Sequence, residues 1–156
     1  MSGLEYEFLM ELHAKLDVHD HGPTPEGHRL VVMATAGYFK GPKLSGEVVG
    51  GTGGDWGRIR NDGSFGLDVR ASIKTDDGAL IYATYGGRGV FKDAEQMGLA
   101  LDFQGEPKVD PEEYYFRTNP VFETSSEKYA WLNGIVAVGK GRLGNGGVTY
   151  DIYAIK

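Results

Sequence analysis

The sequence predicts an all-β protein: a single antiparallel β-barrel of about 8–10 strands with at most one short helix. Runs that alternate apolar and polar residues recur along most of the 156-residue chain. Turn signals rich in glycine separate these runs, and glycine occurs 25 times. The 9 tyrosines, 7 phenylalanines and 2 tryptophans supply apolar area for a core. The glycines are therefore expected at the turns and bends of one folded domain that spans residues 1–156.

The strands of the first part of the chain follow from this alternation. Residues 7–16 place apolar side chains on one face and mostly charged ones on the other. Two further β-rich runs lie at 29–35 and 44–49, and the glycine-rich loop 50–54 follows the second of them. We therefore expect three strands before the first clear hairpin turn.

Two Asp-Gly turns predict hairpins in the middle of the chain. The Asp-Asp-Gly sequence at 76–78 lies between the alternating run 66–75 and the run 79–85. The Asn-Asp-Gly sequence at 61–63 closes residues 57–60 onto the start of the same alternating run. Both turns join runs of strand length, so both predict antiparallel neighbours.

The last third of the chain predicts one short helix and three more strands. Residues 91–100 have fair helix propensity. The strands are expected at 114–118, 131–139 and 148–155, with a glycine turn at 145–147. The middle of these strands is apolar on both faces, whereas a strand of an isolated sheet has one wet face. We therefore expect a barrel whose outer surface is partly covered in a homo-oligomer.

Composition excludes several classes of partner. The formal net charge is −6 and the basic residues do not cluster, so no nucleic-acid partner is expected. The chain has neither a basic amphipathic helix nor the ~20 consecutive apolar residues of a membrane span, so no membrane partner is expected either. Without cysteine and without a signal-like N-terminus, a cytoplasmic protein lacking disulfides and thiolate metal sites is expected.

Motifs for cofactors are incomplete. The stretch 134–141 has the glycine and lysine spacing of a P-loop, but Gly141 stands where a Ser or Thr would hold Mg²⁺. An alternative is a metal site, because His19, His21 and Glu26 are similar to half of a cupin metal motif. All four histidines lie in the N-terminal part of the chain, so the second half of that motif has no counterpart. No cofactor is therefore expected.

Polar pairs at positions i and i+2 recur on the expected strands, and each pair shares a strand face. These pairs are Asp68 with Arg70, Tyr115 with Arg117, and Trp131 with Asn133. If the faces converge inside a barrel, they line a small-molecule pocket, whose mouth Asp55-Trp56 would close. If they face outward, the same residues form the solvated faces of their strands.

Seven motifs occur in an order that resembles a known family. They are Gly27-His28-Arg29, the stretch 37–46, Gly54-Asp55-Trp56, Asp68-Val69-Arg70, the stretch 75–79, the stretch 115–118 with Pro120 and Phe122, and the stretch 129–133. From about Glu7 to its C-terminus the chain resembles the bacterial and fungal domain-of-unknown-function family 3237, also called uncharacterised protein family 0311. The resemblance implies an antiparallel β-barrel, usually oligomeric, with a solvent-accessible central cavity. It implies no established reaction.

The resemblance favours the pocket interpretation of the polar pairs. Asp55 is the preferred acid or base, because a carboxylate beside an arginine, such as Asp68 beside Arg70, has a lowered pKa and is a weaker base. Asp68 and Tyr115 are the further catalytic candidates. The candidates for substrate binding are Arg29, Trp56, Arg70, Arg117, Trp131 and Asn133. Under the alternative interpretation, Asp68 and Arg70 form a structural ion pair and Asp55 is a turn residue.

The predicted function is cofactor-independent acid–base catalysis of the isomerase, lyase or hydrolase kind. The substrate would be a small organic molecule that bears a carbonyl or carboxylate group and binds in the barrel cavity. Two alternatives stay open: a non-catalytic carrier or sensor of a small ligand, and a cupin-like metalloenzyme.

Overall fold

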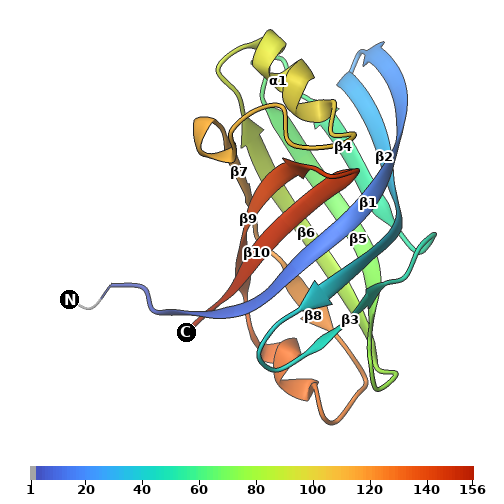
Figure 1. Ribbon diagram of the computed structural model, residues 1–156, viewed down its shortest axis with the longest axis vertical. Helices are drawn as coiled ribbons and strands as arrows, with labels where there is room; N and C mark the ends of the chain where they lie inside the picture. The colour runs from blue at the N-terminus through green and yellow to red at the C-terminus, as the bar shows by residue number, and fades with distance from the viewer. Residues whose placement is uncertain (1–2) are drawn as a thin grey trace.

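Ten antiparallel strands build the molecule (Figure 1), whose structure is a computed structural model that describes residues 3–156. The strands are β1 (Tyr6–Thr24), β2 (Gly27–Lys40), β3 (Ser45–Val48), β4 (Gly54–Ile59), β5 (Phe65–Thr75), β6 (Leu80–Val90), β7 (Tyr115–Thr118), β8 (Val121–Glu123), β9 (Ala137–Gly144) and β10 (Gly147–Ile155). One α-helix and two 3₁₀ helices complete it: α1 (Ala94–Leu101), η1 (Pro111–Glu113) and η2 (Ala130–Gly134).

The sheet closes on itself. Hydrogen-bonded neighbours run β1–β2–β4–β5–β6–β7–β9–β10, and β10 pairs with β1 to complete the circle. The short strand β3 bridges β2 and β5 at the lower end in Figure 1, and β8 adds to β6 at the same end. The predicted antiparallel β-barrel is therefore confirmed.

The turns predicted from Asp-Gly and Asn-Gly signals form the hairpins of the barrel. The turn at 61–63 joins β4 to β5, and the turn at 76–78 joins β5 to β6. Gly63 and Gly78 adopt φ angles of 85° and 92°, a region that residues with a Cβ rarely occupy. The β9–β10 hairpin turns at Asn145, which has a φ of 56°.

The predicted short helix is α1, which lies at the upper end of the barrel in Figure 1. Its N-cap is Asp93, whose Oδ1 accepts a hydrogen bond of 2.8 Å from the Gln96 amide. The segment after the helix returns Phe103 to the barrel, where its side chain is buried. The helix therefore anchors a covering segment at this end.

Two elements differ from the sequence prediction. The predicted strand at 131–139 is the helix η2 in its first part, and β9 begins only at Ala137. The cause is Asn133, whose side chain accepts from the Thr124 amide at 2.8 Å and donates to the Thr124 carbonyl at 3.0 Å, which closes a loop. The strand predicted at 7–16 instead extends as β1 to Thr24, because its polar end pairs with β2 in a hairpin that rises beyond the sheet (Figure 1).

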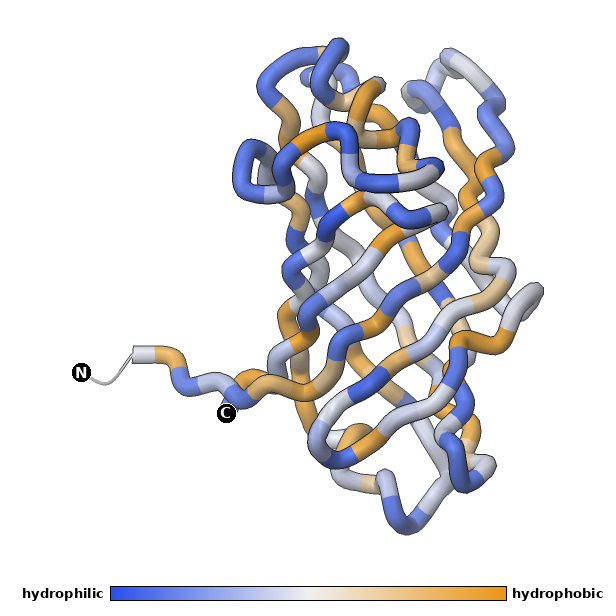
Figure 2. The backbone as a smooth tube through the Cα atoms, viewed as in Figure 1, coloured by the Kyte–Doolittle hydropathy of each residue, from blue (hydrophilic) through white to orange (hydrophobic). Residues whose placement is uncertain are grey.

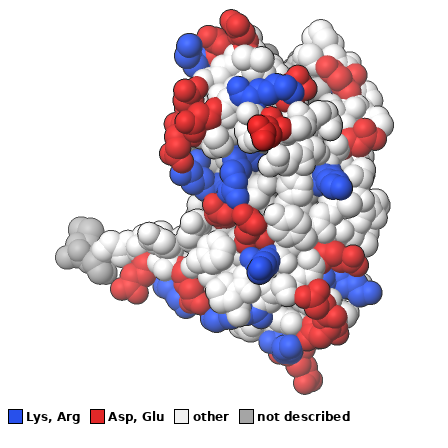
Figure 3. Space-filling model, in the orientation of Figure 1, with Lys and Arg blue, Asp and Glu red and all other residues white. Residues whose placement is uncertain are grey.

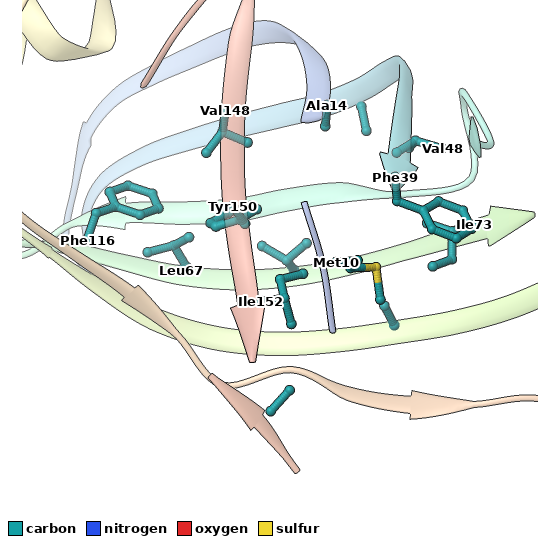
Figure 4. Packing of buried hydrophobic residues seen from close by; sticks show 14 of the residues in the cluster. Met10, Ala14, Phe39, Val48, Leu67, Ile73, Phe116, Val148, Tyr150 and Ile152 are labelled. Carbon is teal, nitrogen blue, oxygen red and sulfur yellow. The ribbon is translucent and has the colours of Figure 1, made fainter. Parts of the chain in front are cut away.

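The interior is apolar and its two ends differ. Figure 2 shows hydrophobic and hydrophilic positions alternating along the strands, as expected for a barrel with one inner and one outer face. Figure 4 shows Phe39, Val48 and Ile73 grouped at one end, while Leu67 and Phe116 lie further along. The lower end is closed to solvent, since Ile73 and Phe39 are both 1% exposed. Val48 and Ile73 are among the residues that line the space left open inside the barrel.

Acidic and basic residues are intermixed on the face drawn in Figure 3. No helix in residues 3–156 has the length and apolar character needed to cross a membrane.

Candidate active site

A cavity of about 250 Å³ lies inside the barrel. This is slightly below the ~300–1,000 Å³ of drug-sized pockets, so the cavity suits a small molecule. Nearly all of its lining is aliphatic or aromatic carbon. The lining residues with polar side chains are Asp20, His28, Asp55, Tyr85 and Tyr150. A few polar groups in an apolar pocket are the usual arrangement for orienting a ligand.

Strand register places Asp55 on the inner wall. Asp55 of β4 pairs with Val32 of β2 on one side and with Val69 of β5 on the other. Val69 pairs in turn with Tyr85 of β6. Directly paired residues of antiparallel strands point to the same face, so this row places Asp55 and Tyr85 on the same inner surface as two buried valines.

A gap in the sheet holds the Asp55 carboxylate. Within the described chain, β4 and β5 pair at Asp55–Val69 and at Arg58–Gly66, and the ladder is interrupted between those pairs. In the gap, the Asp68 amide donates to Asp55 Oδ1 at 2.8 Å. The hydrogen bond fixes the carboxyl group at the wall and leaves its second oxygen available to the cavity.

Arg29 lies on the other side of the same gap. Its Nη1 donates to the carbonyl of Trp56 at 2.7 Å and to that of Gly57 at 3.3 Å. These are the backbone groups of β4 next to Asp55, so the guanidinium satisfies polar groups that the interrupted ladder leaves unpaired. Arg29 is therefore a structural support for the carboxylate rather than part of the cavity lining.

Burial raises the pKa of Asp55 from 3.8 to about 7, and the neighbouring Asp68 charge adds to the rise. The Asp68 amide and the Arg29 charge oppose the increase. A carboxyl group with a pKa near neutrality both accepts and returns a proton at physiological pH, which is what a general acid–base catalyst requires.

Two phenols accompany this carboxyl group. The rings of Tyr85 and Tyr150 meet edge to face with their centroids 5.5 Å apart. Burial raises the pKa of both phenols above the ordinary value of 10, so both hydroxyls keep their protons. Protonated phenols in an apolar site are donors for an oxygen that gains negative charge.

A second polar group lies where the β1–β2 hairpin borders the cavity. His28 Nε2 and Asp20 Oδ1 are 2.6 Å apart, and the Gly22 amide donates to the same Oδ1 at 2.8 Å. The pKa of Asp20 is lowered first by the Gly22 amide and then by His28. Asp20 is therefore an anion that accepts a hydrogen bond from the imidazole N–H.

Four residues predicted for the pocket come together on the outside of the barrel instead. Asp68 and Arg70 are 3.3 Å apart on the outer face of β5, with side chains 58% and 51% exposed. They share a shallow outer groove with Arg29 and Trp56, and the Arg70 guanidinium lies 5.7 Å from the Trp56 ring centroid. The expectation that this face lines the cavity is wrong, because the alternate residues, among them Val69, occupy the inner face.

The other polar pairs also lie outside the cavity. Tyr115 and Arg117 are on the outer face of β7, where the guanidinium carbon is 4.8 Å from the Tyr115 ring centroid. Trp131 and Asn133 are in η2, where Lys43 Nζ lies 5.3 Å from the Trp131 ring. Of the residues predicted for the pocket, Asp55 alone is among its described lining.

The residues of the alternative metal site do not converge. His19, His21 and Glu26 are exposed along the β1–β2 hairpin, and His19 lies 3.5 Å from Asp17. Across residues 3–156, three or more metal-ligating side chains are nowhere gathered in one place.

Sequence reasoning missed four of the five polar lining residues: Asp20, His28, Tyr85 and Tyr150. Strand alternation could have identified two of them. Every second residue of β1 faces inward and Asp20 is the last of this row, while His28 is the first inward-facing residue of β2. The pairing of the two rows shifts by one residue between Asp20 and Gly22, and alternation within each strand does not predict this shift. The inward orientation of Tyr85 follows only once its pairing with Val69 is known.

A family model described as "Protein of unknown function (DUF3237)" matches residues 4–155. A UPF0311 protein of Rhodopseudomonas palustris is 32% identical over 153 residues, which is 97% of each chain, and its crystal structure matches this one with a TM-score of 0.89. A β-barrel-like protein of Acinetobacter baumannii is 36% identical with a TM-score of 0.83, covering 100% of this chain and 98% of that one. A hydroalkoxylation enzyme of Penicillium herquei is 30% identical over 105 residues, 67% of this chain and 52% of that protein.

Proposed function

The chain belongs to the DUF3237 family, and on this premise we propose that its barrel is a cofactor-independent enzyme that transfers protons on a small, uncharged, oxygen-bearing molecule. The observation that carries the proposal is Asp55, a carboxyl group with a pKa of about 7 in the wall of an apolar cavity. A carrier gains nothing from such a group, because burying a carboxyl that ionises near neutral pH costs stability. Perturbed carboxyls in pockets are common at catalytic sites.

The residues around the cavity have different roles in the proposed reaction. Asp55 takes a proton from a carbon next to a carbonyl, or from a hydroxyl, and returns it to another atom of the same molecule. Tyr85 or Tyr150 donates a hydrogen bond to the oxygen that becomes negative meanwhile. Because the proton taken by Asp55 returns to the same molecule, the net change is an isomerisation or an intramolecular addition.

The cavity lining favours a neutral substrate over an anionic one. Among the described lining residues, His28 is the only one whose side chain can carry a positive charge. Arg70 and Arg117 lie outside the cavity, so they do not hold a substrate carboxylate there. We therefore favour a ketone, enone or phenol over a carboxylic acid.

The hydroalkoxylation enzyme of Penicillium herquei supports the same class of chemistry. Hydroalkoxylation adds the O–H bond of a hydroxyl group across a carbon–carbon double bond, so that oxygen bonds to one carbon and hydrogen to the other. Asp55 would take the hydroxyl proton, the oxygen would form a C–O bond, and the electron pair of the double bond would take a proton back from Asp55. Those steps need one group that works as base and then as acid, with a pKa near the working pH.

The test is proton exchange on a neutral ketone. Wild-type protein is incubated with 2-tetralone in D₂O, and deuterium uptake next to the carbonyl is followed by mass spectrometry. We expect uptake above the buffer rate that rises with pH through about 7, because the Asp55 carboxylate is the base. Asp55→Asn should lose about 100-fold or more of this rate, while the outer-wall control Asp68→Asn keeps it. Binding of the ketone without any Asp55-dependent exchange would instead support a ligand carrier.

We also propose that the barrel forms a homo-oligomer through an aromatic patch on its outer wall. Phe8, Tyr153 and Val138 are cross-strand neighbours on β1, β10 and β9, and the Phe8 and Tyr153 rings are 5.6 Å apart. Phe8 and Val138 are exposed although apolar. Exposed apolar patches of this kind are typical of contacts between proteins. Light scattering should give a mass above 17.0 kDa for wild type and a smaller one for Val138→Lys.

A further inference from the structure

The Asp20–His28 pair borders the cavity, yet the proton transfer proposed for Asp55 does not use it. Both side chains line the same cavity as Asp55. The His28 ring is 33% exposed, so the pair lies where the cavity meets solvent. Asp20 is held by the Gly22 amide at 2.8 Å and by His28 at 2.6 Å, which fixes both the carboxylate and the ring.

The pair is separated from Asp55 by a layer of apolar wall. His28 pairs with Ile59, four residues along β4 from Asp55. At the usual rise per residue of a strand, four residues correspond to roughly 13 Å. The layer between contains Leu30 and Leu67, which line the cavity, and Gly57, which has no side chain. The cavity therefore has two polar levels with an apolar section between them.

Hydrogen bonding within the hairpin engages one nitrogen of His28, Nε2, with Asp20. The Asp20 carboxylate has a lowered pKa and is an acceptor, so the proton of the neutral imidazole is on Nε2. Within residues 3–156 no hydrogen bond to Nδ1 is present, and this nitrogen is an acceptor in the neutral ring. A ligand that meets His28 should consequently bring a donor, such as a hydroxyl group.

We propose that His28, positioned by Asp20, is a recognition subsite for a hydroxyl group on the cavity ligand. The ligand class is an elongated molecule with an apolar body, a reacting oxygen-bearing group beside Asp55 and a hydroxyl near the β1–β2 hairpin. The inference rests on the proposed function in taking the barrel cavity as the substrate site. It requires no turnover, so it is tested by binding alone.

The experiment compares the affinities of 4-propylphenol and 4-propylanisole by isothermal titration calorimetry at pH 8. The two probes have the same apolar body, and only the phenol donates a hydrogen bond. We expect wild type to bind the phenol about 3- to 10-fold more tightly, the ratio that corresponds to one hydrogen bond. His28→Phe should abolish this ratio while still binding the anisole, and Asp20→Asn should reduce it. His21→Phe, a histidine on the exposed part of the same hairpin, should preserve it.

Several outcomes would overturn the inference. One is a phenol preference that survives in His28→Phe, above all if Asp55→Asn removes it, since the hydroxyl would then bind at the deeper carboxyl. Another is equal affinity of wild type for the two probes, or binding of neither. His28→Gln, which retains an amide of similar reach, guards against misfolding in the phenylalanine variant. If wild type catalyses no exchange of 2-tetralone, the proton-transfer proposal is refuted. The phenol preference is still tested by the binding measurements alone.

Discussion

The inner and outer walls of this barrel are made of the same strands, yet they carry polar residues in opposite ways. On the outer wall of β5, Asp68 and Arg70 alternate regularly with buried residues and pair with each other in solvent. On the inner wall, Asp55 interrupts an apolar surface and its pKa is raised by burial. Regular polar alternation therefore marks the solvated face, and a single polar residue on the apolar face marks the site.

The energetic consequence of a charge differs between the walls. An exposed ion pair such as Asp68–Arg70 contributes about 0–1 kcal/mol, because water already solvates both groups. An ionised carboxylate facing the cavity has lost part of its hydration, so its charge costs stability. Three of the following comparisons pair an inner residue with an outer one, and the fourth pairs two outer arginines.

The largest expected effect is the pH dependence of stability at Asp55. Its pKa is higher in the folded chain, so wild type loses stability as pH rises from about 4 to about 7 and loses no more above that. The rise from 3.8 to about 7 corresponds to at most about 4 kcal/mol. Urea unfolding of Asp55→Asn should therefore show a gain over wild type that grows across this range. Asp68→Asn should change the free energy of unfolding by less than about 0.5 kcal/mol. Parallel curves for wild type and Asp55→Asn would mean that Asp55 is solvated.

Truncation of neighbouring residues on β6 compares packing on the two walls. Ile81 is 0% exposed, whereas Leu80 is 60% exposed. Ile81→Ala should lower the free energy of unfolding by about 3 kcal/mol through lost burial and a new cavity, and Leu80→Ala by less than about 0.5 kcal/mol. Urea unfolding monitored by tryptophan fluorescence measures both. Equal losses would contradict the inward orientation of Ile81.

The tyrosines provide a comparison based on activity. Tyr85→Phe removes a phenol that lines the cavity, while Tyr115→Phe removes one that is 52% exposed on the outer wall. We expect deuterium uptake by 2-tetralone to fall about 10- to 100-fold for Tyr85→Phe, because the enolate oxygen loses a donor. Tyr115→Phe should stay within twofold of wild type. If the exchange rate is unchanged in Tyr85→Phe but falls in Tyr150→Phe, the donor is Tyr150.

The smallest expected effect concerns two outer arginines at different distances from Asp55. Arg29 lowers the pKa of Asp55, so Arg29→Gln should move the pH midpoint of the exchange rate upward by up to about one pH unit. Arg29→Lys keeps the charge and should recover part of the change. Arg70→Gln removes a guanidinium paired with Asp68 and should leave the midpoint in place. A shift in Arg70→Gln as large as in Arg29→Gln would attribute the effect to overall charge.

The fold could be predicted from the sequence because the turns and the strand alternation that indicate it are local features. The Asp-Gly turns at 61–63 and 76–78 and the alternation in β5 need no knowledge of distant residues. The site was readable only at Asp55, which follows the glycine-rich loop. Tyr85 and Tyr150 meet through barrel closure, and His28 meets Asp20 across a register shift. These contacts depend on strand pairing between distant segments, which alternation alone does not determine.

The interrupted ladder between β4 and β5 gives the molecule an internal spectroscopic reporter. The Asp68 amide donates to a titrating carboxylate, whereas most amides of the sheet donate to carbonyls whose charge does not change with pH. Its proton resonance should therefore move to higher frequency as Asp55 ionises, with a midpoint near pH 7. A two-dimensional NMR titration can read the ionisation of the cavity from one backbone signal, before any substrate is known.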